Sequence, residues 1–197
     1  MREKLAIIYS SVDGQTKKIC EKLNSIFEKE QIKTELHSID KFNTDLLQYH
    51  TLVIGASIRY GKHNHKVSEF ILRNMNKLDE IQTAFFSVNL VARKKDKNSA
   101  STNPYMIKFL DEIKWKADFL QVFAGKLDYD SYSFLDRIMI KLIMLITNGP
   151  IKSKEPIEFT EWESVNDFGL KIIENYKNTK HNNGSYEKSR SLGQSHS

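Results

Sequence analysis

The chain has 197 residues, of which 40% are hydrophobic and 28% charged, so it is long enough and apolar enough for one domain with a substantial core. Its 30 Lys and Arg against 25 Asp and Glu give a formal net charge of +5, which favours an anionic partner such as a phosphate, a carboxylate, an acidic lipid or a nucleic acid. A mean hydropathy of -0.50 argues against an integral membrane protein, and the one cysteine, Cys20, excludes an internal disulfide and a thiolate metal cluster.

The first half of the chain alternates predicted strands and helices. Residues Met1–Lys4 pass directly into an apolar strand at Leu5–Ser10, without the long apolar segment of a signal peptide, so we expect a cytosolic or cytoplasmic-face protein. Apolar residues spaced three to four apart predict a helix from Gln15 onward, and Thr34–Ile39 alternates as a short strand. The continuous apolar run Thr51–Ala56 is typical of a strand buried on both faces. The next helix carries Val67, Phe70, Ile71 and Met75.

The second half repeats this alternation. Thr83–Leu90 and Phe119–Gly125 predict two more strands, with a helix between them and a closing helix at Glu161–Tyr176. Strands that alternate with helices indicate an α/β fold of three layers, in which a five-stranded parallel sheet has helices on both faces. We therefore expect one domain over residues 1–176, and the polar composition of residues 177–197 predicts a disordered tail.

An apolar insertion, at about residues 128–150, lies between the fifth strand and the closing helix. It is too short to span a bilayer, which needs about 20 apolar residues. Arg137 and Lys141 are four residues apart and share a helix face, while Tyr129, Tyr132 and Phe134 suit a headgroup boundary. An interfacial helix, a helix packed on the domain as extra core and a dimer interface are all open interpretations.

The loop after the first strand has the features of an anion site. It combines the hydroxyls of Ser10, Ser11 and Thr16 with a flexible Gly14 and the start of a helix, whose amides and dipole favour negative charge. We interpret it as the holder of the phosphate of a flavin mononucleotide. The alternative is a plain strand-to-helix turn with Ser11 or Asp13 as the N-cap.

Two further loops, Ser57–Gly61 and Ser87–Arg93, also follow strands, and ligands bind at the carboxyl ends of strands in open parallel sheets. One phosphate loop with two loops flanking a planar ring is the arrangement of a flavodoxin. Tyr60 either stacks on such a ring or covers its own turn, and Arg59 either faces a carboxylate or is solvated.

Four segments carry a closer resemblance, and they extend from the first strand to the last helix without the tail. They are Ser11–Thr16, Val53–Gly61, Phe86–Lys94 and Asp136–Met144. The first is weakly specific, the second and third together are strong, and the fourth is close to diagnostic. Through them the chain resembles the flavodoxin-type, quinone-dependent protoporphyrinogen IX dehydrogenases of bacterial haem biosynthesis.

The resemblance implies a flavodoxin-like three-layer fold and an FMN cofactor held by the three loops. The residues that map onto them are Ser10, Ser11, Val12, Asp13, Gly14, Gln15, Thr16, Ser57, Ile58, Arg59, Tyr60, Gly61, Ser87, Val88, Asn89, Leu90 and Val91. Val12 and Asp13 stand where ordinary flavodoxins often have hydroxyls. Since a carboxylate beside a phosphate is unfavourable, we expect Asp13 to point away or cap the helix, and FMN to be held less tightly than in an electron carrier.

The resemblance also implies the reaction. An oxidoreductase of this kind takes six electrons from protoporphyrinogen IX in three two-electron steps and passes them to menaquinone or ubiquinone. It works as a peripheral protein on the cytoplasmic face of the bacterial inner membrane. No nucleic-acid partner and no metal are expected, and a homo-oligomer is left open.

The catalytic base is not identified. His63 and His65 have suitable pKa values, although solvated loop histidines are the commoner case. The two propionates of the substrate call for cations. The candidates are Arg59, Arg93, Arg137 and Lys141, with Lys94 and Lys95 beside them.

Three other functions stay open: a non-catalytic flavodoxin electron carrier, a flavodoxin-like NAD(P)H:quinone reductase, and a membrane or nucleic-acid adaptor without flavin. Carriers tend to be acidic, whereas this chain is basic and has an apolar insertion. Reduction of the flavin by NADPH would identify the reductase, and a purified protein that stays yellow would argue against the adaptor.

Overall fold

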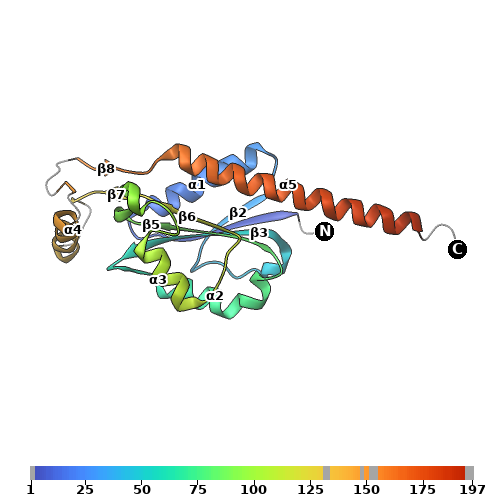
Figure 1. Ribbon diagram of the computed structural model, residues 1–197, viewed down its shortest axis with the longest axis horizontal. Helices are drawn as coiled ribbons and strands as arrows, with labels where there is room; N and C mark the ends of the chain where they lie inside the picture. The colour runs from blue at the N-terminus through green and yellow to red at the C-terminus, as the bar shows by residue number, and fades with distance from the viewer. Residues whose placement is uncertain (1–2, 131–133, 147–148, 151–154, 194–197) are drawn as a thin grey trace.

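Five parallel strands form the central sheet of the computed structural model, which describes residues 3–130, 134–146, 149–150 and 155–193. The strands are β1 (Lys4–Ser10), β2 (Thr34–Ser38), β3 (Tyr49–Arg59), β5 (Gln82–Val88) and β6 (Phe119–Phe123). Their order is β2-β1-β3-β5-β6, so the chain reverses its direction of travel across the sheet between β1 and β3 (Figure 1). In doubly wound sheets a crevice opens at this switch point.

Helices cover both faces of the sheet. On one face lie α1 (Gln15–Lys29) and α5 (Trp162–Gly193), and on the other lie α2 (His65–Leu78) and α3 (Pro104–Ile113) (Figure 1). Alternate side chains of a strand point to opposite faces, so Leu5 of β1 packs in the core under α1 and α5 while Ala6 packs in the core under α2 and α3. The predicted three-layer fold with a five-stranded parallel sheet is therefore confirmed.

Short 3-10 helices connect some of these elements. They are η1 (Leu46–Gln48), η2 (Leu90–Arg93) and η3 (Lys95–Lys97). Because η2 follows β5 directly, the predicted strand at Thr83–Leu90 ends two residues earlier than expected.

The predicted loop Ser57–Gly61 is partly a strand, which corrects the sequence interpretation. β3 continues to Arg59 and turns back through Tyr60 and Gly61 into β4 (Lys62–His63), with Arg59 opposite Lys62. Tyr60 and Gly61 have φ angles of 50° and 76°, and two positive φ angles define the tight turn that suits a two-residue hairpin. The hairpin extends beyond the parallel sheet, where its residues are polar rather than apolar. The sequence pattern therefore predicts an irregular loop there instead of a strand.

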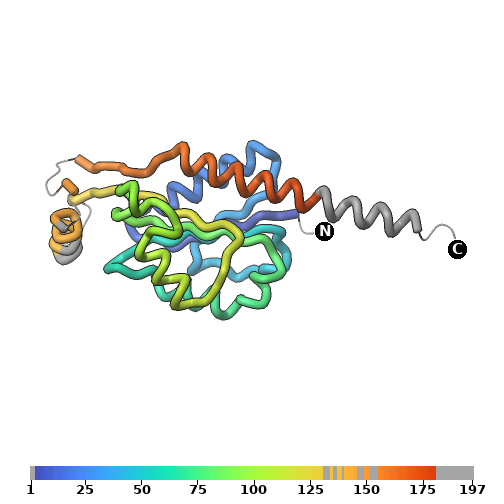
Figure 2. The backbone as a smooth tube through the Cα atoms, viewed as in Figure 1, coloured from blue at the N-terminus to red at the C-terminus, as the bar shows by residue number. Residues whose placement is uncertain are grey.

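The insertion is a separate ribbon that carries a helix. β7 (Lys126–Leu127) pairs antiparallel with β8 (Ile157–Glu158), and α4 (Phe134–Ile146) lies between them in the chain. The two strands leave the main body side by side, at the end opposite the C-terminus (Figure 2). The insertion thus begins and ends outside the predicted range of about 128–150. Within the described residues, no helix combines the length and apolarity needed to cross a membrane.

α5 continues beyond the predicted end of the domain at residue 176. Lys177 Nζ lies 2.7 Å from Glu30 Oε2, and Lys180 Nζ lies 3.1 Å from Glu3 Oε1. Thr179 Oγ1 lies 3.0 Å from Nε2 of His50, which precedes the buried core of β3. These contacts fix the helix to the first residues of the chain and to the end of α1, and the backbone remains helical to Gly193. Over residues 177–193 the backbone is thus helical where the sequence predicts a disordered tail, and residues 194–197 lie outside the described residues.

Candidate functional site

A cleft of about 840 Å³, its open mouth included, lies at the carboxyl ends of β1, β3 and β5. The residues that line it are Ser11, Asp13, Gln15, Thr16, Ser57, Ile58, Arg59, Tyr60, Gly61, Val88, Asn89, Leu90, Val91, Tyr105, Gly125, Lys126, Ile140 and Ile143. The structure therefore brings the three predicted loops together around one cleft.

Four of the predicted residues do not line the cleft. Ser10 and Ser87 are buried, Val12 is 52% exposed, and Gly14 forms the turn that precedes α1. Ser10 contributes through its backbone, because its carbonyl oxygen accepts a hydrogen bond of 3.4 Å from the Ser57 hydroxyl. This contact joins the first loop to the second.

The N-terminus of α1 has the backbone features of an anion site. Its N-cap is Gly14, with a φ of 82°, which has no side chain to cap the helix, and the Ser11 hydroxyl accepts a long hydrogen bond of 3.4 Å from the Lys17 amide. An added Cβ at Gly14 would meet no atom within 4 Å, so the left-handed backbone rather than lack of space requires glycine. The N-cap residue is thus Gly14 rather than Ser11 or Asp13, although Ser11 does accept from one first-turn amide, as the alternative interpretation implies. The remaining first-turn amides and the helix dipole still favour an anion at this end of the cleft.

The buried hydroxyl of Thr16 is a second, independent indication that this end of the cleft receives a hydrogen-bond acceptor. Its side chain lines the cleft, the residue is 1% exposed, and its hydroxyl has no hydrogen-bond partner among the described residues. Buried hydroxyls are nearly always paired, and a phosphate oxygen would accept from this one. The neighbouring Gln15 is already engaged, since its Nε2 donates to Thr160 Oγ1 at 2.8 Å.

Asp13 forms an ion pair with Arg59 from the second loop. Nη1 of Arg59 lies 2.9 Å and 2.8 Å from the two carboxylate oxygens of Asp13. Asp13 therefore pairs with a cation from the end of β3 and does not cap α1, so the capping part of the expectation is wrong. The pair offsets the negative charge beside the anion site. It also means that Arg59, predicted to bind a carboxylate of the substrate, already holds one from its own chain.

Buried side-chain amides hold the third loop, Ser87–Arg93, in place. Asn89 Oδ1 accepts hydrogen bonds from the Ala92 amide at 3.0 Å and from Asn103 Nδ2 at 3.2 Å. Asn103 Oδ1 in turn caps α3, accepting from the amides of Tyr105 and Met106. Asn103 and Tyr105 were missed from the sequence, although an Asn directly before a Pro at the first position of a helix is an N-cap signal.

His63 belongs to the structure of this loop rather than to proton transfer. Its ring packs against those of Phe85 and Phe109, which stack on each other, at centroid distances of 5.6 Å and 4.4 Å, and its Nε2 lies 2.9 Å from Ser87 Oγ. Desolvation by burial lowers the pKa of His63 to about 3. A group with that pKa is neutral and weakly basic near pH 7, so it is a poor candidate for the catalytic base. His65 is exposed at the start of α2.

Of the four cations predicted to bind the substrate, only Arg59 lines the cleft. Arg93 Nη1 donates to the Leu90 carbonyl at 2.9 Å, its guanidinium lies 6.0 Å from the Phe159 ring centroid, and burial lowers its pKa. Arg93 therefore holds η2 against the base of the insertion. Arg137 and Lys141 lie on α4 outside the cleft lining, whereas Lys126, which was not predicted, lines the cleft.

The end of the cleft away from α1 is apolar. Leu90 and Val91 of η2 meet Ile140 and Ile143 of α4 there. The two isoleucines belong to the insertion, and the sequence alone gave no sign that they would reach the predicted loops. The cleft thus joins an anion site at one end to an apolar wall at the other.

Comparison with known proteins gives consistent results. A flavodoxin domain model matches residues 6–154. Protoporphyrinogen IX dehydrogenase (quinone) of Escherichia coli strain K12 is 38% identical over 170 residues, which cover 86% of this chain and 94% of that protein. The protein of the same name from Leishmania major is 37% identical over 167 residues, covering 84% and 72% of the two chains. A solved flavodoxin from the domain Archaea shares the fold, with a TM-score of 0.53, 14% identity and coverage of 88% and 99%.

The placement of His63 predicts a specific pH dependence of stability. The pKa is about 3 in the folded chain and about 6.5 in the unfolded chain, so below pH 6.5 the unfolded state binds more protons. His63 should therefore lower the free energy of unfolding by up to about 1.4 kcal/mol for each pH unit between 6.5 and 3. Urea unfolding at pH 7, 6, 5 and 4 measures the free energy of unfolding of both proteins. The difference between His63→Gln and the unaltered protein should change by this amount for each pH unit below 6.5.

The matched control is His65→Gln, which replaces an exposed histidine two residues away. It should keep the pH dependence of the unaltered protein. A pH-independent difference for His63→Gln would show that the ring is not held in its neutral form by burial.

Proposed function

The chain belongs to the flavodoxin-type family of quinone-dependent protoporphyrinogen IX dehydrogenases, and we propose that it oxidises protoporphyrinogen IX to protoporphyrin IX with a quinone as acceptor. Six electrons and six protons leave the porphyrinogen, and three molecules of menaquinone or ubiquinone become three quinols. The observation that carries the proposal is the cleft itself, which joins an anion site to an apolar wall contributed in part by α4. The names of the relatives favour this reaction over the carrier and the NAD(P)H:quinone reductase.

Membership of the flavodoxin family supports a flavin as the cofactor, and we propose FMN specifically. The first-turn amides of α1, the Thr16 hydroxyl and the Ser11 side chain would hold its phosphate. The hairpin residue Tyr60 and the third-loop residues Asn89 and Leu90 would flank its ring. Bound there, the flavin supplies the two-electron redox chemistry that amino-acid side chains lack.

The remaining residues of the cleft would bind and orient the substrates. Ile140, Ile143 and Val91 offer an apolar surface for a macrocycle or a quinone ring, and Lys126 is a cation in the lining. Arg59, Arg93, Arg137 and Lys141 remain predictions as ligands of the propionates. We also propose that the protein works as a peripheral protein on the cytoplasmic face of the bacterial inner membrane, where its quinone resides. A homo-oligomer remains a prediction.

An anaerobic titration tests the proposed function. Purified protein is loaded with FMN and mixed with protoporphyrinogen IX, and a menaquinone analogue is added after the flavin absorbance has been followed. We expect the flavin to bleach, porphyrin fluorescence to grow, and the quinone to restore the oxidised spectrum. Bleaching by NADPH but not by porphyrinogen would contradict the proposal and indicate a quinone reductase.

Replacing Thr16 by Val tests the phosphate site. The substitution keeps the shape of the side chain and removes the hydroxyl, and a hydrogen bond to a charged group contributes roughly 1.5–3 kcal/mol. The dissociation constant for FMN should therefore rise by about 10- to 100-fold in a fluorescence titration. Riboflavin, which lacks the phosphate, is the control ligand and should bind both proteins equally. An equal loss for both ligands would mean that Thr16 does not face the phosphate.

Neutralising the two members of the Asp13–Arg59 ion pair should have opposite effects on the affinity for FMN. Asp13→Asn leaves the Arg59 charge unopposed beside the phosphate and should tighten FMN about two- to fivefold, the scale of a partly exposed ion pair. Arg59→Gln leaves Asp13 unpaired and should weaken FMN by a similar factor. Both effects should shrink at high salt. Equal weakening by both substitutions would show that the pair only connects the two loops.

A further inference from the structure

One side of α4 presents a continuous apolar surface to the outside. Its members are Phe134, Ile138, Leu142 and Leu145, which are 77%, 49%, 49% and 60% exposed and which we call the outer stripe. At 3.6 residues per turn they fall within about 80° of the helix circumference and extend about 16 Å along its axis. A monomeric soluble protein seldom exposes such a row, and contiguous apolar surface of this kind marks an interaction site.

The opposite side of the same helix faces the cleft. Ile140 and Ile143 line it, and Met144 is fully buried against Leu127 and Tyr129 of the insertion. On the helical wheel these residues lie across from the outer stripe. α4 therefore contacts the cleft on one side and the surroundings on the other.

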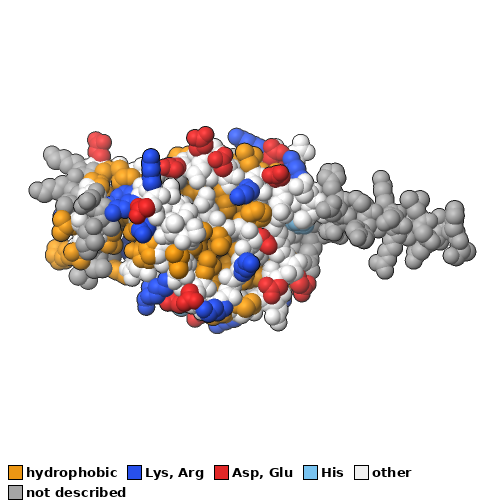
Figure 3. Space-filling view, viewed as in Figure 1, with side chains coloured by type: hydrophobic (Ala, Val, Ile, Leu, Met, Phe, Trp, Pro, Cys, Tyr) orange, Lys and Arg blue, Asp and Glu red, His pale blue; other side chains and the backbone are white. Residues whose placement is uncertain are grey.

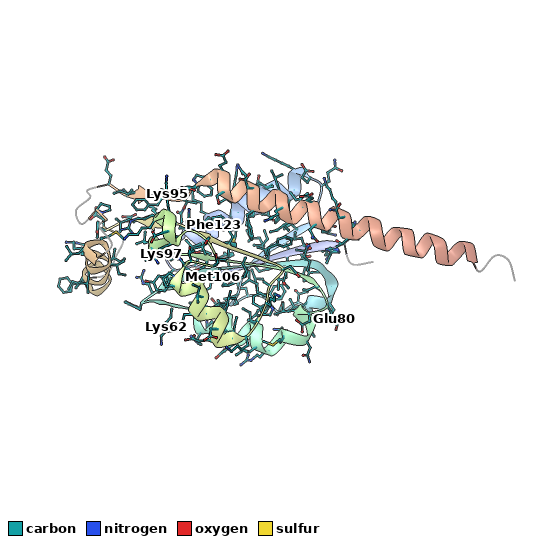
Figure 4. All side chains as sticks on the ribbon, viewed as in Figure 1. Lys62, Glu80, Lys95, Lys97, Met106 and Phe123 are labelled. Atoms are coloured by element: carbon teal, nitrogen blue, oxygen red, sulfur yellow. The ribbon has the colours of Figure 1, made fainter. Side chains whose placement is uncertain are left out.

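Positive charge accompanies the outer stripe. Lys141 is exposed on the flank of the stripe, and Lys95 and Lys97 of η3 lie at the same end of the molecule as β7 (Figure 4). Figure 3 shows hydrophobic side chains gathered at this end, with Lys and Arg side chains and a smaller number of Asp and Glu side chains nearby. A short helix with an apolar side, flanked by lysines and too short to span a bilayer, suits the surface of an anionic membrane.

We propose that the outer stripe lies in a lipid surface and that α4 forms the access wall along which a lipid-soluble quinone reaches the cleft. The inference rests on the proposed function, which supplies the quinone. An isoprenoid quinone is dissolved in the bilayer, and an apolar helix that contacts both lipid and cleft lets its ring pass from one to the other without exposure to water. The occupant of the outer stripe is thus lipid, rather than a second copy of the chain.

The test uses the full chain loaded with FMN and reduced with dithionite under anaerobic conditions, so that it does not depend on porphyrinogen oxidation. Its acceptors are menaquinone in vesicles of phosphatidylethanolamine and phosphatidylglycerol, and a soluble naphthoquinone without an isoprenoid tail. Vesicle binding is measured by flotation, and flavin reoxidation by stopped-flow absorbance. The variant Leu142→Gln/Leu145→Gln alters the outer stripe. The matched control, Leu72→Gln/Leu170→Gln, alters two leucines that are 55% and 53% exposed on α2 and α5.

We expect the outer-stripe variant to lose vesicle binding and reoxidation by vesicle-borne menaquinone by about tenfold or more, because two leucines no longer enter the lipid. Its reoxidation by the soluble naphthoquinone should match that of the unaltered protein, and the control variant should behave normally with both acceptors. A further variant, Ile143→Trp, narrows the cleft side of α4. It should slow reoxidation by both quinones and leave vesicle binding unchanged.

Three results would overturn the proposal. Unchanged vesicle binding by the outer-stripe variant would show that lipid does not cover the stripe. Lost vesicle binding with an unchanged rate for vesicle-borne menaquinone would show that the quinone takes another route. Dimeric unaltered protein and monomeric variant in analytical ultracentrifugation, with equal vesicle binding, would assign the stripe to a second copy. If instead porphyrinogen fails to reduce the flavin while these reoxidation results hold, the proposed function fails and the access wall stands.

Discussion

The N-terminus of α1 is the constraint around which the cleft is organised. Its N-cap is a glycine and Ser11 pairs with only the Lys17 amide, so other first-turn amides need an acceptor, and beside them lies a buried threonine hydroxyl with the same need. The sequence also places a carboxylate, Asp13, at this point, which by itself would oppose an anion. β3 extends past the parallel sheet, so that Arg59 reaches Asp13 from 46 residues away and offsets its negative charge. The hairpin therefore balances the charge of the first loop and also forms a wall of the cleft.

The other end of the cleft depends on a buried hydrogen-bond network and on apolar packing rather than on charge. Its third loop is held by Asn89 and Asn103, two buried amides that satisfy one another and cap both a 3-10 helix and α3. A network of this kind leaves no unpaired polar atom to attract water, which keeps the neighbouring Leu90 and Val91 in an apolar setting. The insertion completes that setting with side chains of α4. One site can thus accept a charged phosphate and an apolar ring system because the two are held apart along its length.

Local patterns in the sequence predicted the sheet, because burial on both faces makes each strand a nearly continuous apolar run, as at Thr51–Ala56. They also predicted where the loops would meet, since parallel strands end at one edge. What they missed depends on contacts between distant residues. Three such contacts have no local signature: the Asp13–Arg59 pair, the packing of His63 against two phenylalanine rings, and the attachment of α5 to Glu30 and Glu3 through Lys177 and Lys180. The apolar residues of α4 were visible, but their division into an inner and an outer side is fixed only by the tertiary structure.

The β7–α4–β8 ribbon has a consequence for how the molecule opens. It joins the main body through two two-residue strands, and its small core centres on Leu127, Tyr129 and Met144. None of the five parallel strands pairs with it. Regions with few buried contacts open at lower free energy than the core, in separate cooperative units. The ribbon is therefore a unit that can unfold and refold while the sheet keeps its register, and amide exchange there reports a local equilibrium distinct from global unfolding.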